Sequence, residues 1–294
     1  DAAAQRYGKV GGFAHLATLV KQLRAEAGPG NSLLLDGGDT WQGSGTALWT
    51  RGKDMVGACN LLGVDVMTGH WEFTYPDTEV IANIQAFKGE FVAQNISISD
   101  TALFDYKFAD FPGFDEASGL AFKPYTIKEV NGTKVAVIGQ AFPYTPIANP
   151  QRFIPDWRFG IQDERMQEMV DRVRAKEKPD LVVMLSHNGM DVDLKMASRV
   201  RGIDVIFGGH THDGMPAPSL VENAGGKTLV TNAGSNGKFL GVMDLEVGDG
   251  KLKGYRYRLL PVFANLLPPD VEMQAYIDQV RQPHLPQLRE HLAG

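Results

Sequence analysis

The stretch Val205-Ile-Phe-Gly-Gly-His-Thr-His-Asp213 decides how the rest of the sequence is interpreted. Its apolar part, from Asp204 to Phe207, predicts a buried strand, and the two glycines after it allow the backbone to turn. His210 and His212 follow at once, and residues two apart on an extended segment point to the same side. Neutral imidazole is a common ligand for divalent transition metals. The pair is therefore a candidate for metal binding at the carboxyl end of a strand, and two solvated loop histidines are the alternative.

Length and composition are typical of a globular protein with one large domain or two ordinary ones. The chain has 294 residues, of which 43% are hydrophobic and 22% charged. Its formal net charge of −6 does not indicate a nucleic-acid-binding protein. No apolar run approaches the roughly 20 residues of a membrane span. The single cysteine, Cys59, excludes an internal disulfide and a cysteine-rich zinc site.

Predicted strands alternate with predicted helices along most of the chain. Short apolar runs predict strands at 32–35, 64–68, 91–93, 180–185, 204–207 and 228–231. Helical periodicity between them predicts helices at 13–23, 55–62, 77–87, 166–173 and 191–200, and the tail from 270 also looks helical. Turn residues predict two hairpins, at 125–139 and 239–260. Segments 100–119 and 141–158 are expected to be irregular. This alternation is typical of an α/β fold with a largely parallel sheet.

Side chains that can bind a metal follow four of the predicted strands: Asp39, His70, His187 and the pair His210 and His212. The carboxyl ends of parallel strands meet at one edge of a sheet, so these donors are expected to converge. Nitrogen and carboxylate oxygen without thiolate suit Mn²⁺, Fe, Zn²⁺ or Ni²⁺. Five donors exceed what one catalytic zinc takes, so we expect two divalent metal ions about 3.5–4 Å apart, bridged by Asp39. Because such a pair lowers the pKa of bound water, we also predict catalytic roles for Asp39, His70 and His212.

Each residue at or beside this predicted site has an alternative interpretation. Asp39 is alternatively the cap of a following helix. Trp71 is either a core residue or a wall of the pocket that excludes water. Glu72 either orients a ligand imidazole or is a surface charge, and Asn188 has the same two alternatives. Asn232, after a predicted strand, is expected to line the pocket.

A resemblance to a known superfamily rests on four motifs, which are Gly38-Asp39, the Gly69 loop, His187 and Gly208-Gly-His-Thr-His212. They resemble the calcineurin-like metallophosphoesterase superfamily, and within it the 5′-nucleotidase branch. The resemblance implies an α/β fold of the metallophosphoesterase type, a sandwich of two mixed β-sheets flanked by helices. It further implies a catalytic domain over 1–267 and a helical linker over 268–294 toward a carboxy-terminal substrate domain.

One motif departs from the superfamily pattern and narrows the resemblance. The superfamily usually has Gly-Asn-His-Glu/Asp there, with the Asn as a metal ligand and the His as an assistant in catalysis. This chain has Gly69-His70-Trp71-Glu72, which, with Asp39-Thr-Trp-Gln-Gly-Ser44 and the opening at 6–13, is similar to the SoxB thiosulfohydrolases of bacterial sulfur oxidation. That family removes the terminal sulfonate from a cysteine S-thiosulfonate on the carrier SoxYZ, using two manganese ions, in the periplasm. The resemblance implies these cofactors, this partner and this location for the chain.

Three functions stay open at this point. The first is the release of sulfate from the SoxYZ-bound thiosulfonate, whose thiol or persulfide leaving group needs less help from a general acid than an alkoxide does. The second is a 5′-nucleotidase or another metal-dependent phosphoesterase, which Trp71 in place of the catalytic His disfavours. The third is an incomplete, inactive domain that serves only as a carrier-docking module. It is considered because the superfamily's first-strand Asp-x-His does not occur before Asp39, which would leave the first metal site with only Asp39 and His212.

Overall fold

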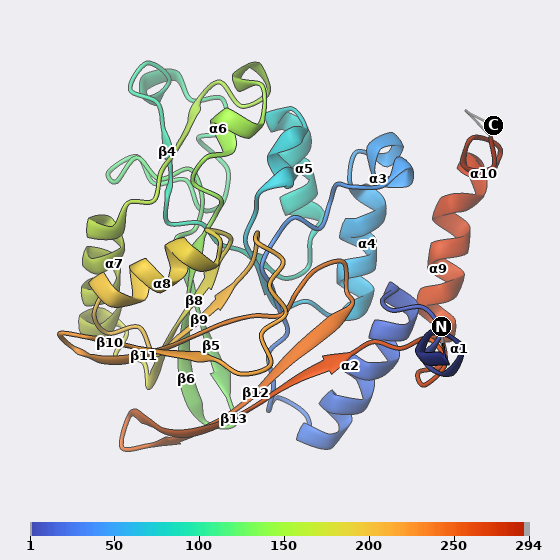
Figure 1. Ribbon diagram of the computed structural model, residues 1–294. Coiled ribbons are helices and arrows are strands. Elements are labelled where there is room, and N and C mark those ends of the chain that lie inside the picture. The colour runs from blue at the N-terminus through green and yellow to red at the C-terminus, as the bar shows by residue number, and fades with distance from the viewer. Residues whose placement is uncertain (1, 291–294) are drawn as a thin grey trace.

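The computed structural model describes residues 2–290, and its largest sheet has six strands in the order β10-β11-β9-β8-β6-β5 (Figure 1). These strands are β5 (Tyr125–Val130), β6 (Thr133–Gln140), β8 (Leu181–Ser186), β9 (Val205–Gly208), β10 (Ser219–Asn223) and β11 (Gly226–Asn232). The four inner strands run parallel, and the outer strands β5 and β10 are antiparallel to their neighbours. The inner strands are buried along most of their length, which explains their continuous apolar runs.

A second sheet has the order β1-β2-β3 and is entirely parallel. Its strands are β1 (Leu35–Asp36), β2 (Val66–Met67) and β3 (Glu90–Phe91). Two antiparallel pairs complete the strands in residues 2–290, β4 (Ile96–Ile98) with β7 (Trp157–Phe159) and β12 (Phe239–Gly248) with β13 (Lys251–Pro261). The α/β class is confirmed, and both predicted hairpins form.

Helices cover the sheets, with α7 and α8 beside the six-stranded sheet and α2, α4 and α9 on the other side of the molecule (Figure 1). The α-helices are α1 (Ala2–Tyr7), α2 (Phe13–Ala27), α3 (Gly45–Thr50), α4 (Lys53–Leu62), α5 (Asp77–Ala86), α6 (Thr145–Ala148), α7 (Asp163–Lys176), α8 (Met190–Arg199), α9 (Val271–Arg281) and α10 (Leu285–Leu288). Single 3₁₀ turns are η1 (Trp71–Thr74), η2 (Leu103–Asp105), η3 (Gln151–Phe153) and η4 (Gln282–His284). No helix within residues 2–290 is long and apolar enough to span a membrane.

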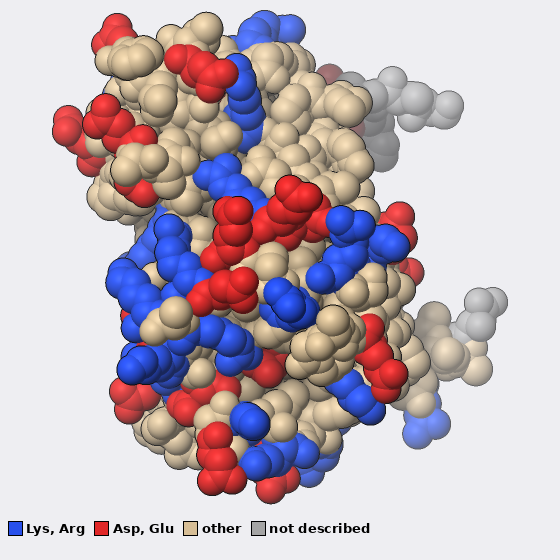
Figure 2. All heavy atoms as spheres, turned by 90° about the vertical axis from the view of Figure 1, so that its left-hand side faces the viewer, with Lys and Arg blue, Asp and Glu red and all other residues tan. Residues whose placement is uncertain are grey.

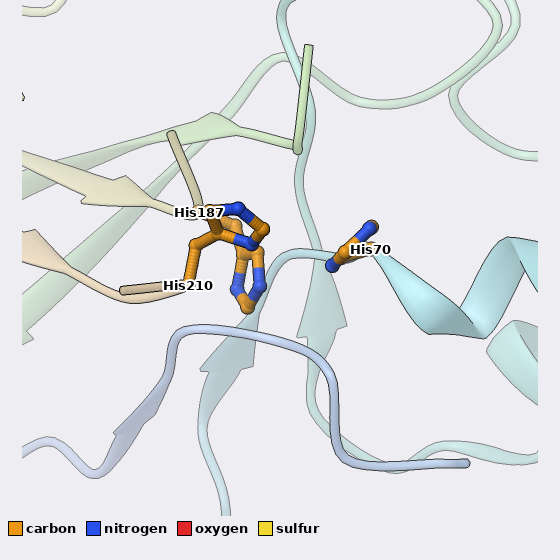
Figure 3. Close-up of side chains that lie close together, drawn as sticks. All are labelled: His70, His187 and His210. Carbon is orange, nitrogen blue, oxygen red and sulfur yellow. The ribbon is translucent and has the colours of Figure 1, made fainter. Parts of the chain in front are cut away.

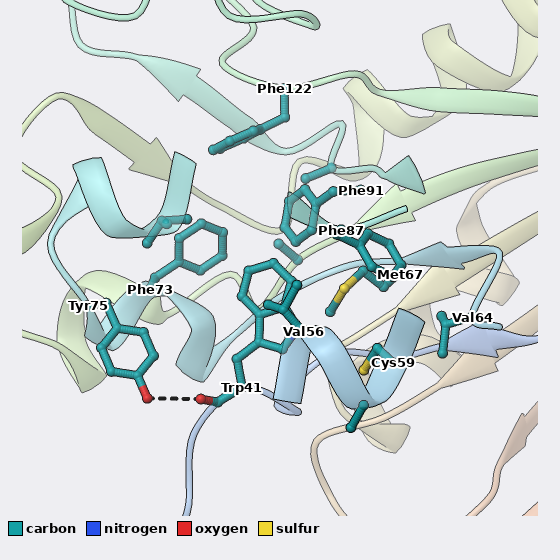
Figure 4. Packing of buried hydrophobic residues seen from close by; sticks show 14 of the residues in the cluster. Trp41, Val56, Cys59, Val64, Met67, Phe73, Tyr75, Phe87, Phe91 and Phe122 are labelled. Carbon is teal, nitrogen blue, oxygen red and sulfur yellow. Dashed lines mark hydrogen bonds between the residues drawn. The ribbon is translucent and has the colours of Figure 1, made fainter. Parts of the chain in front are cut away.

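An aromatic core supports the loop that follows β1 (Figure 4). Trp41, two residues beyond Asp39, is completely buried and packs with Phe91. Phe73, on η1, contacts Phe91 edge-to-face at 6.2 Å between ring centroids. The Tyr75 hydroxyl donates a hydrogen bond of 2.9 Å to the Trp41 carbonyl. The segments that carry Asp39 and His70 are therefore anchored to one rigid core.

Three features differ from the sequence prediction. Segment 141–158, expected to be irregular, contains the short helix α6, the turn η3 and the start of β7. Strands β4 and β10 and helix α3 were not predicted, because the first two are short or half-exposed and α3 has only six residues. The helix α9, in the predicted linker, packs on the domain: Met273 is buried in the core and the Tyr276 hydroxyl donates to the Asp54 carbonyl at 2.8 Å. Its role as a linker to a further domain stays a prediction.

The face that carries α7 has basic and acidic side chains interspersed (Figure 2). Ion pairs hold some of them, including Arg174 with Asp204 at 2.8 Å and Arg199 with Asp163. A face of mixed sign produces no extended field of the kind that attracts a polyanion.

Candidate metal centre

The candidate ligands lie where two pairs of parallel strands end. Strands β1 and β2 are hydrogen-bonded neighbours, and Asp39 and His70 each come three residues after them. Strands β8 and β9 are neighbours in the other sheet. His187 is the first residue after β8, and His210 is the second residue after β9. The site thus forms between the carboxyl ends of two different sheets, whereas one edge of a single sheet was expected from the sequence.

Three histidines form the centre of this cluster (Figure 3). His70, His187 and His210 each offer a ligand nitrogen, and these atoms all lie within 4.8 Å of one another. Asp39 completes the group, because its Oδ2 lies 4.0 Å from His70 Nδ1 and 3.9 Å from His187 Nε2. The structure therefore brings together four of the five side chains that the sequence nominated.

The fifth, His212, is exposed and lies outside the group of three. His210 and His212 themselves are left-handed, with φ of 76° and 60°, so this segment is not extended. The premise of an extended segment, from which the two imidazoles were expected to point the same way, is therefore wrong. The assignment of His212 as a ligand stays a prediction, and its imidazole is near enough to contribute, after burial, to lowering the pKa of His210.

Burial keeps the clustered imidazoles neutral. It lowers the pKa of His70 to about 2 and that of His187 to about 3, and the nearby histidines contribute to both shifts. The Nδ1–H of His187 donates to the Gly37 carbonyl at 2.7 Å, which leaves its Nε2 with a free lone pair. Neither ring nitrogen of His70, nor His187 Nε2, has a hydrogen-bond partner among residues 2–290.

Buried nitrogens without partners are costly unless something binds them, and a cation held by neutral imidazoles satisfies them. The bond from His187 to a backbone carbonyl is also the support that metal-binding histidines usually have. Burial, and secondly the charge of Glu72, raise the pKa of Asp39 to about 7. A bound cation would offset this by stabilising the carboxylate. The residues present therefore fit a transition-metal centre.

Glu72 connects the two loops on the side of β1 and β2. Its carboxylate is fully buried and accepts four backbone N–H groups, from Asp39 at 3.0 Å, Thr40 at 2.7 Å, Trp41 at 3.2 Å and His70 at 2.6 Å. Glu72 is therefore neither a surface charge nor a partner of an imidazole, the two alternatives that the sequence left. It acts on the backbone of two ligands.

The two predicted asparagines support ligand loops. Asn188 is buried, accepts from Gln140 Nε2 and donates to Asp193, both at 3.1 Å. It is thus not at the surface. Asn232 is also buried, and its side chain donates to the Gly209 carbonyl at 3.3 Å, so it holds the loop of His210.

Aromatic rings border His70. The Trp71 ring centroid lies 5.0 Å from that of His70, and Trp71 is half-buried, in keeping with a wall of the site. Phe142, which sequence reasoning missed, lies closer: its ring is 4.1 Å from His70 and 4.1 Å from His210. Phe142 belongs to the proline-rich segment 141–158, which was expected to be irregular. It was missed because that segment has no periodicity from which a buried position can be predicted.

Asp36 was also missed. It ends β1, and its carboxylate accepts from the Gly38 N–H and the Thr40 hydroxyl, each at 2.9 Å. Burial raises its pKa to about 6. The sequence feature that could have indicated Asp36 is its position at the end of an apolar strand, directly before two glycines. Its bonds shape the turn that presents Asp39.

Comparison with known proteins places these features in context. No family model matches the chain. Among solved structures, the sulfate thiohydrolase SoxB of Thermus thermophilus is 38% identical with a TM-score of 0.85, over 97% of this chain and 49% of that one. A 5′-nucleotidase precursor of Thermus thermophilus is 27% identical with a TM-score of 0.82, over 97% of this chain and 55% of that one.

Among curated proteins, the 5′-nucleotidase of Rattus norvegicus is 31% identical over 258 residues, which are 82% of this chain and 42% of the rat protein. The chain spans about half the length of the first curated relatives that it matches. Together with the fold, these similarities support the assignment of the chain to the 5′-nucleotidase-like metallophosphoesterase family.

Proposed function

We propose that the chain is the catalytic domain of a metal-dependent hydrolase that releases sulfate from a cysteine S-thiosulfonate. The observation that carries the proposal is the neighbour of His70. Trp71 lies beside His70, at the position where the superfamily has a histidine that assists catalysis. Phe142 packs against His210, another histidine of the cluster. Neither ring is a general acid for an alkoxide leaving group. A thiol or persulfide leaves as a weak base and needs less protonation.

The chain's own residues prepare the site for this reaction. When bound, two divalent cations would supply Lewis acidity and a water of lowered pKa. Neutral His70, His187 and His210 present ligand nitrogens, and the Asp39 carboxylate lies between two of them. Glu72 fixes the backbone of Asp39 and His70, so the ligands need little rearrangement. The donor set suits manganese, and also zinc, iron or nickel.

The partner and the location belong to the same proposal. The substrate would be a small anionic sulfonate group carried on the cysteine of a SoxYZ-type protein, in the periplasm. Support comes from the similarity to SoxB over 97% of the chain. The division into a catalytic domain at 1–267 and a linker at 268–294 is proposed with it.

A nucleotide phosphoesterase is the second candidate, and the curated relatives favour it. The similar proteins of known name include 5′-nucleotidases and an apyrase. Phosphorus and sulfur in these esters are both tetrahedral anionic centres, so the same metal ligands suit either. The neighbour of His70 is what separates the two candidates.

The decisive experiment compares two substrates on the same manganese-loaded protein. One is a peptide with a cysteine S-thiosulfonate, and the other is a nucleoside monophosphate. We expect kcat/KM to be higher for the peptide, and we expect Trp71→His to shift the ratio toward the nucleotide. Higher activity of the native protein on the nucleotide would favour the second candidate. No activity on either, with one metal ion per chain or none, would favour an inactive docking module.

A further inference from the structure

One buried carboxylate outside the ligand set holds the turn that carries His187. Asp193 lies near the start of α8 and is fully buried. Its Oδ1 accepts hydrogen bonds from the Ser186 hydroxyl at 2.6 Å and from Asn188 Nδ2 at 3.1 Å. Ser186 and Asn188 are the two residues that flank His187, and the Asn188 N–H donates to the Ser186 hydroxyl at 3.1 Å. The turn is therefore tied to α8 on both sides of the ligand.

The other oxygen of the same carboxylate lies against the loop of His210. Asp193 Oδ2 has no hydrogen-bond partner among residues 2–290. A Cβ atom at Gly208 would lie 2.5 Å from it and 3.2 Å from the Thr231 carbonyl. Gly208 does not have a positive φ, so it is required here for space and not for conformation. Because Gly208 comes two residues before His210, Asp193 sits between the two histidine loops.

This carboxylate belongs to a larger buried network. Asn188 accepts from Gln140 Nε2 at 3.1 Å, and Gln140 accepts from Gln94 Nε2 at 2.7 Å. Gln140 Nε2 also donates to the Ile161 carbonyl at 2.8 Å. The network connects Asp193 to the end of β6, next to β8 in the sheet. A buried network of this kind favours one geometry, because a rearrangement would break several buried hydrogen bonds.

Helix capping does not explain the arrangement. A carboxylate near a helix N-terminus is favoured by the helix dipole, but that effect requires neither burial nor side-chain partners. The exposed Asp191 on the same turn of α8 already supplies a charge there. The partners of Asp193 are the neighbours of a ligand instead.

We propose that Asp193 is a positioning residue that fixes His187 relative to His210, so that their ligand nitrogens keep the spacing a metal ion needs. The inference rests on the metal-dependent hydrolase proposed above. Among residues 2–290, Asp193 makes no hydrogen bond to any of the four clustered ligand side chains, and it acts through Ser186, Asn188 and Gly208. Removing such support typically weakens metal affinity about 10- to 100-fold.

The test measures Co²⁺ binding to the full chain by absorption spectroscopy, without substrate. Asp193→Ala removes both oxygens, whereas Asp193→Asn keeps the size and the Oδ1 acceptor that both hydrogen bonds use. We expect the Co²⁺ dissociation constant to rise about 10- to 100-fold in Asp193→Ala, with an altered spectrum, and Asp193→Asn to retain most of the native affinity. Glu164→Gln, an exposed first-turn carboxylate on α7, is the matched control and should bind as the native chain does. Native affinity and spectrum in Asp193→Ala, even with a lowered Tm, would overturn the proposal.

A double-mutant cycle tests the placement of the carboxylate between the loops. Gly208→Ala should weaken Co²⁺ binding strongly in the native background, because the new methyl group meets Oδ2. In the Asp193→Ala background the same change should cost less, since that oxygen is gone. Equal costs in both backgrounds would show that the two residues are not coupled and would contradict the inference.

A metal-free readout separates this inference from the proposed function. The imidazole ¹H–¹⁵N NMR signals of His187 should move in Asp193→Ala and stay in place in Glu164→Gln. If the native chain bound no Co²⁺, the metal-dependent function would fail, whereas the NMR comparison would still decide whether Asp193 positions His187. Unmoved His187 signals in Asp193→Ala would overturn the inference alone.

Discussion

The two halves of the metal centre position their ligands by different means. On the side of β1 and β2, Asp39 and His70 each lie three residues beyond a strand, and one side chain, Glu72, accepts the N–H groups of both. On the side of β8 and β9, the ligands follow the strands more closely. There a network of side chains surrounds His187, with Asp193 at its centre.

The difference follows from the length of the loops. A longer loop after a strand leaves several backbone N–H groups without sheet partners, and these must be satisfied if they are buried. A single carboxylate with four acceptor positions can do this, and Glu72 is fully buried for that purpose. A tight turn has fewer free N–H groups, so its geometry depends on side-chain bonds shared among several residues. The geometry of the first half therefore depends mainly on one residue, Glu72. The geometry of the second half depends on several side chains together.

The largest expected effect comes from removing Glu72. Glu72→Ala leaves four N–H groups unpaired, two of them on the buried residues Trp41 and His70, so the free energy of unfolding should fall by about 3–5 kcal/mol. Ser186→Ala, which removes two hydrogen bonds of the other half, should cost about 2 kcal/mol. Urea unfolding of the metal-free proteins measures both. Glu168→Ala, an exposed change on α7, serves as the control and should be near neutral. Similar losses for Glu72→Ala and Ser186→Ala would remove the contrast between the halves.

A smaller effect is expected in the pH dependence of the second half. Burial lowers the pKa of His187 from 6.5 to about 3, so the unfolded chain binds a proton there that the folded chain does not. The stability that neutral His187 contributes is full above pH 6.5 and is lost as the pH falls toward 3. His187→Gln cannot titrate and lacks this dependence.

The measurement is the free energy of unfolding of the metal-free native chain and of His187→Gln, at pH 5 and at pH 7. The native value minus the variant value should be larger at pH 7 by about 2 kcal/mol. The buried aspartates contribute a pH dependence of opposite sign to the free energy of unfolding. Both proteins contain these aspartates, so their contribution cancels in the difference. An unchanged difference would mean that His187 becomes protonated in the folded chain near its ordinary pKa.

The sequence predicted the elements whose local pattern and tertiary position agree. Strands β8 and β9 are buried on both faces, so they appear as continuous apolar runs, and the Asn131-Gly132 turn identifies its hairpin. Strand β10 was missed because it is half-exposed and follows two prolines. Helix α6 was missed because four residues in a proline-rich segment have no periodicity.

The ligands were predictable for a topological reason, and their supports were not. Within one sheet, parallel strands end at one edge, so a histidine or aspartate after each strand is enough to propose a site. The division of the ligands between two sheets was not predicted. Glu72 binds backbone N–H groups, which have no signature in the sequence. Asp193 did have one: it shares a helix face with Met196 and Ala197, and both of these are buried. A carboxylate on the apolar face of a helix indicates a buried partner.

The smallest effect is expected at Asn232, which joins the second half from β11. Its amide donates one long hydrogen bond, 3.3 Å, to the Gly209 carbonyl and accepts one from the Gly234 N–H at 3.2 Å. Asn232→Ala should lower the free energy of unfolding by about 1 kcal/mol in urea unfolding and weaken Co²⁺ binding only a few-fold. Gln287→Ala, exposed on α10, is the control and should change neither. A loss as large as that of Glu72→Ala would mean that the second half also depends on a single residue.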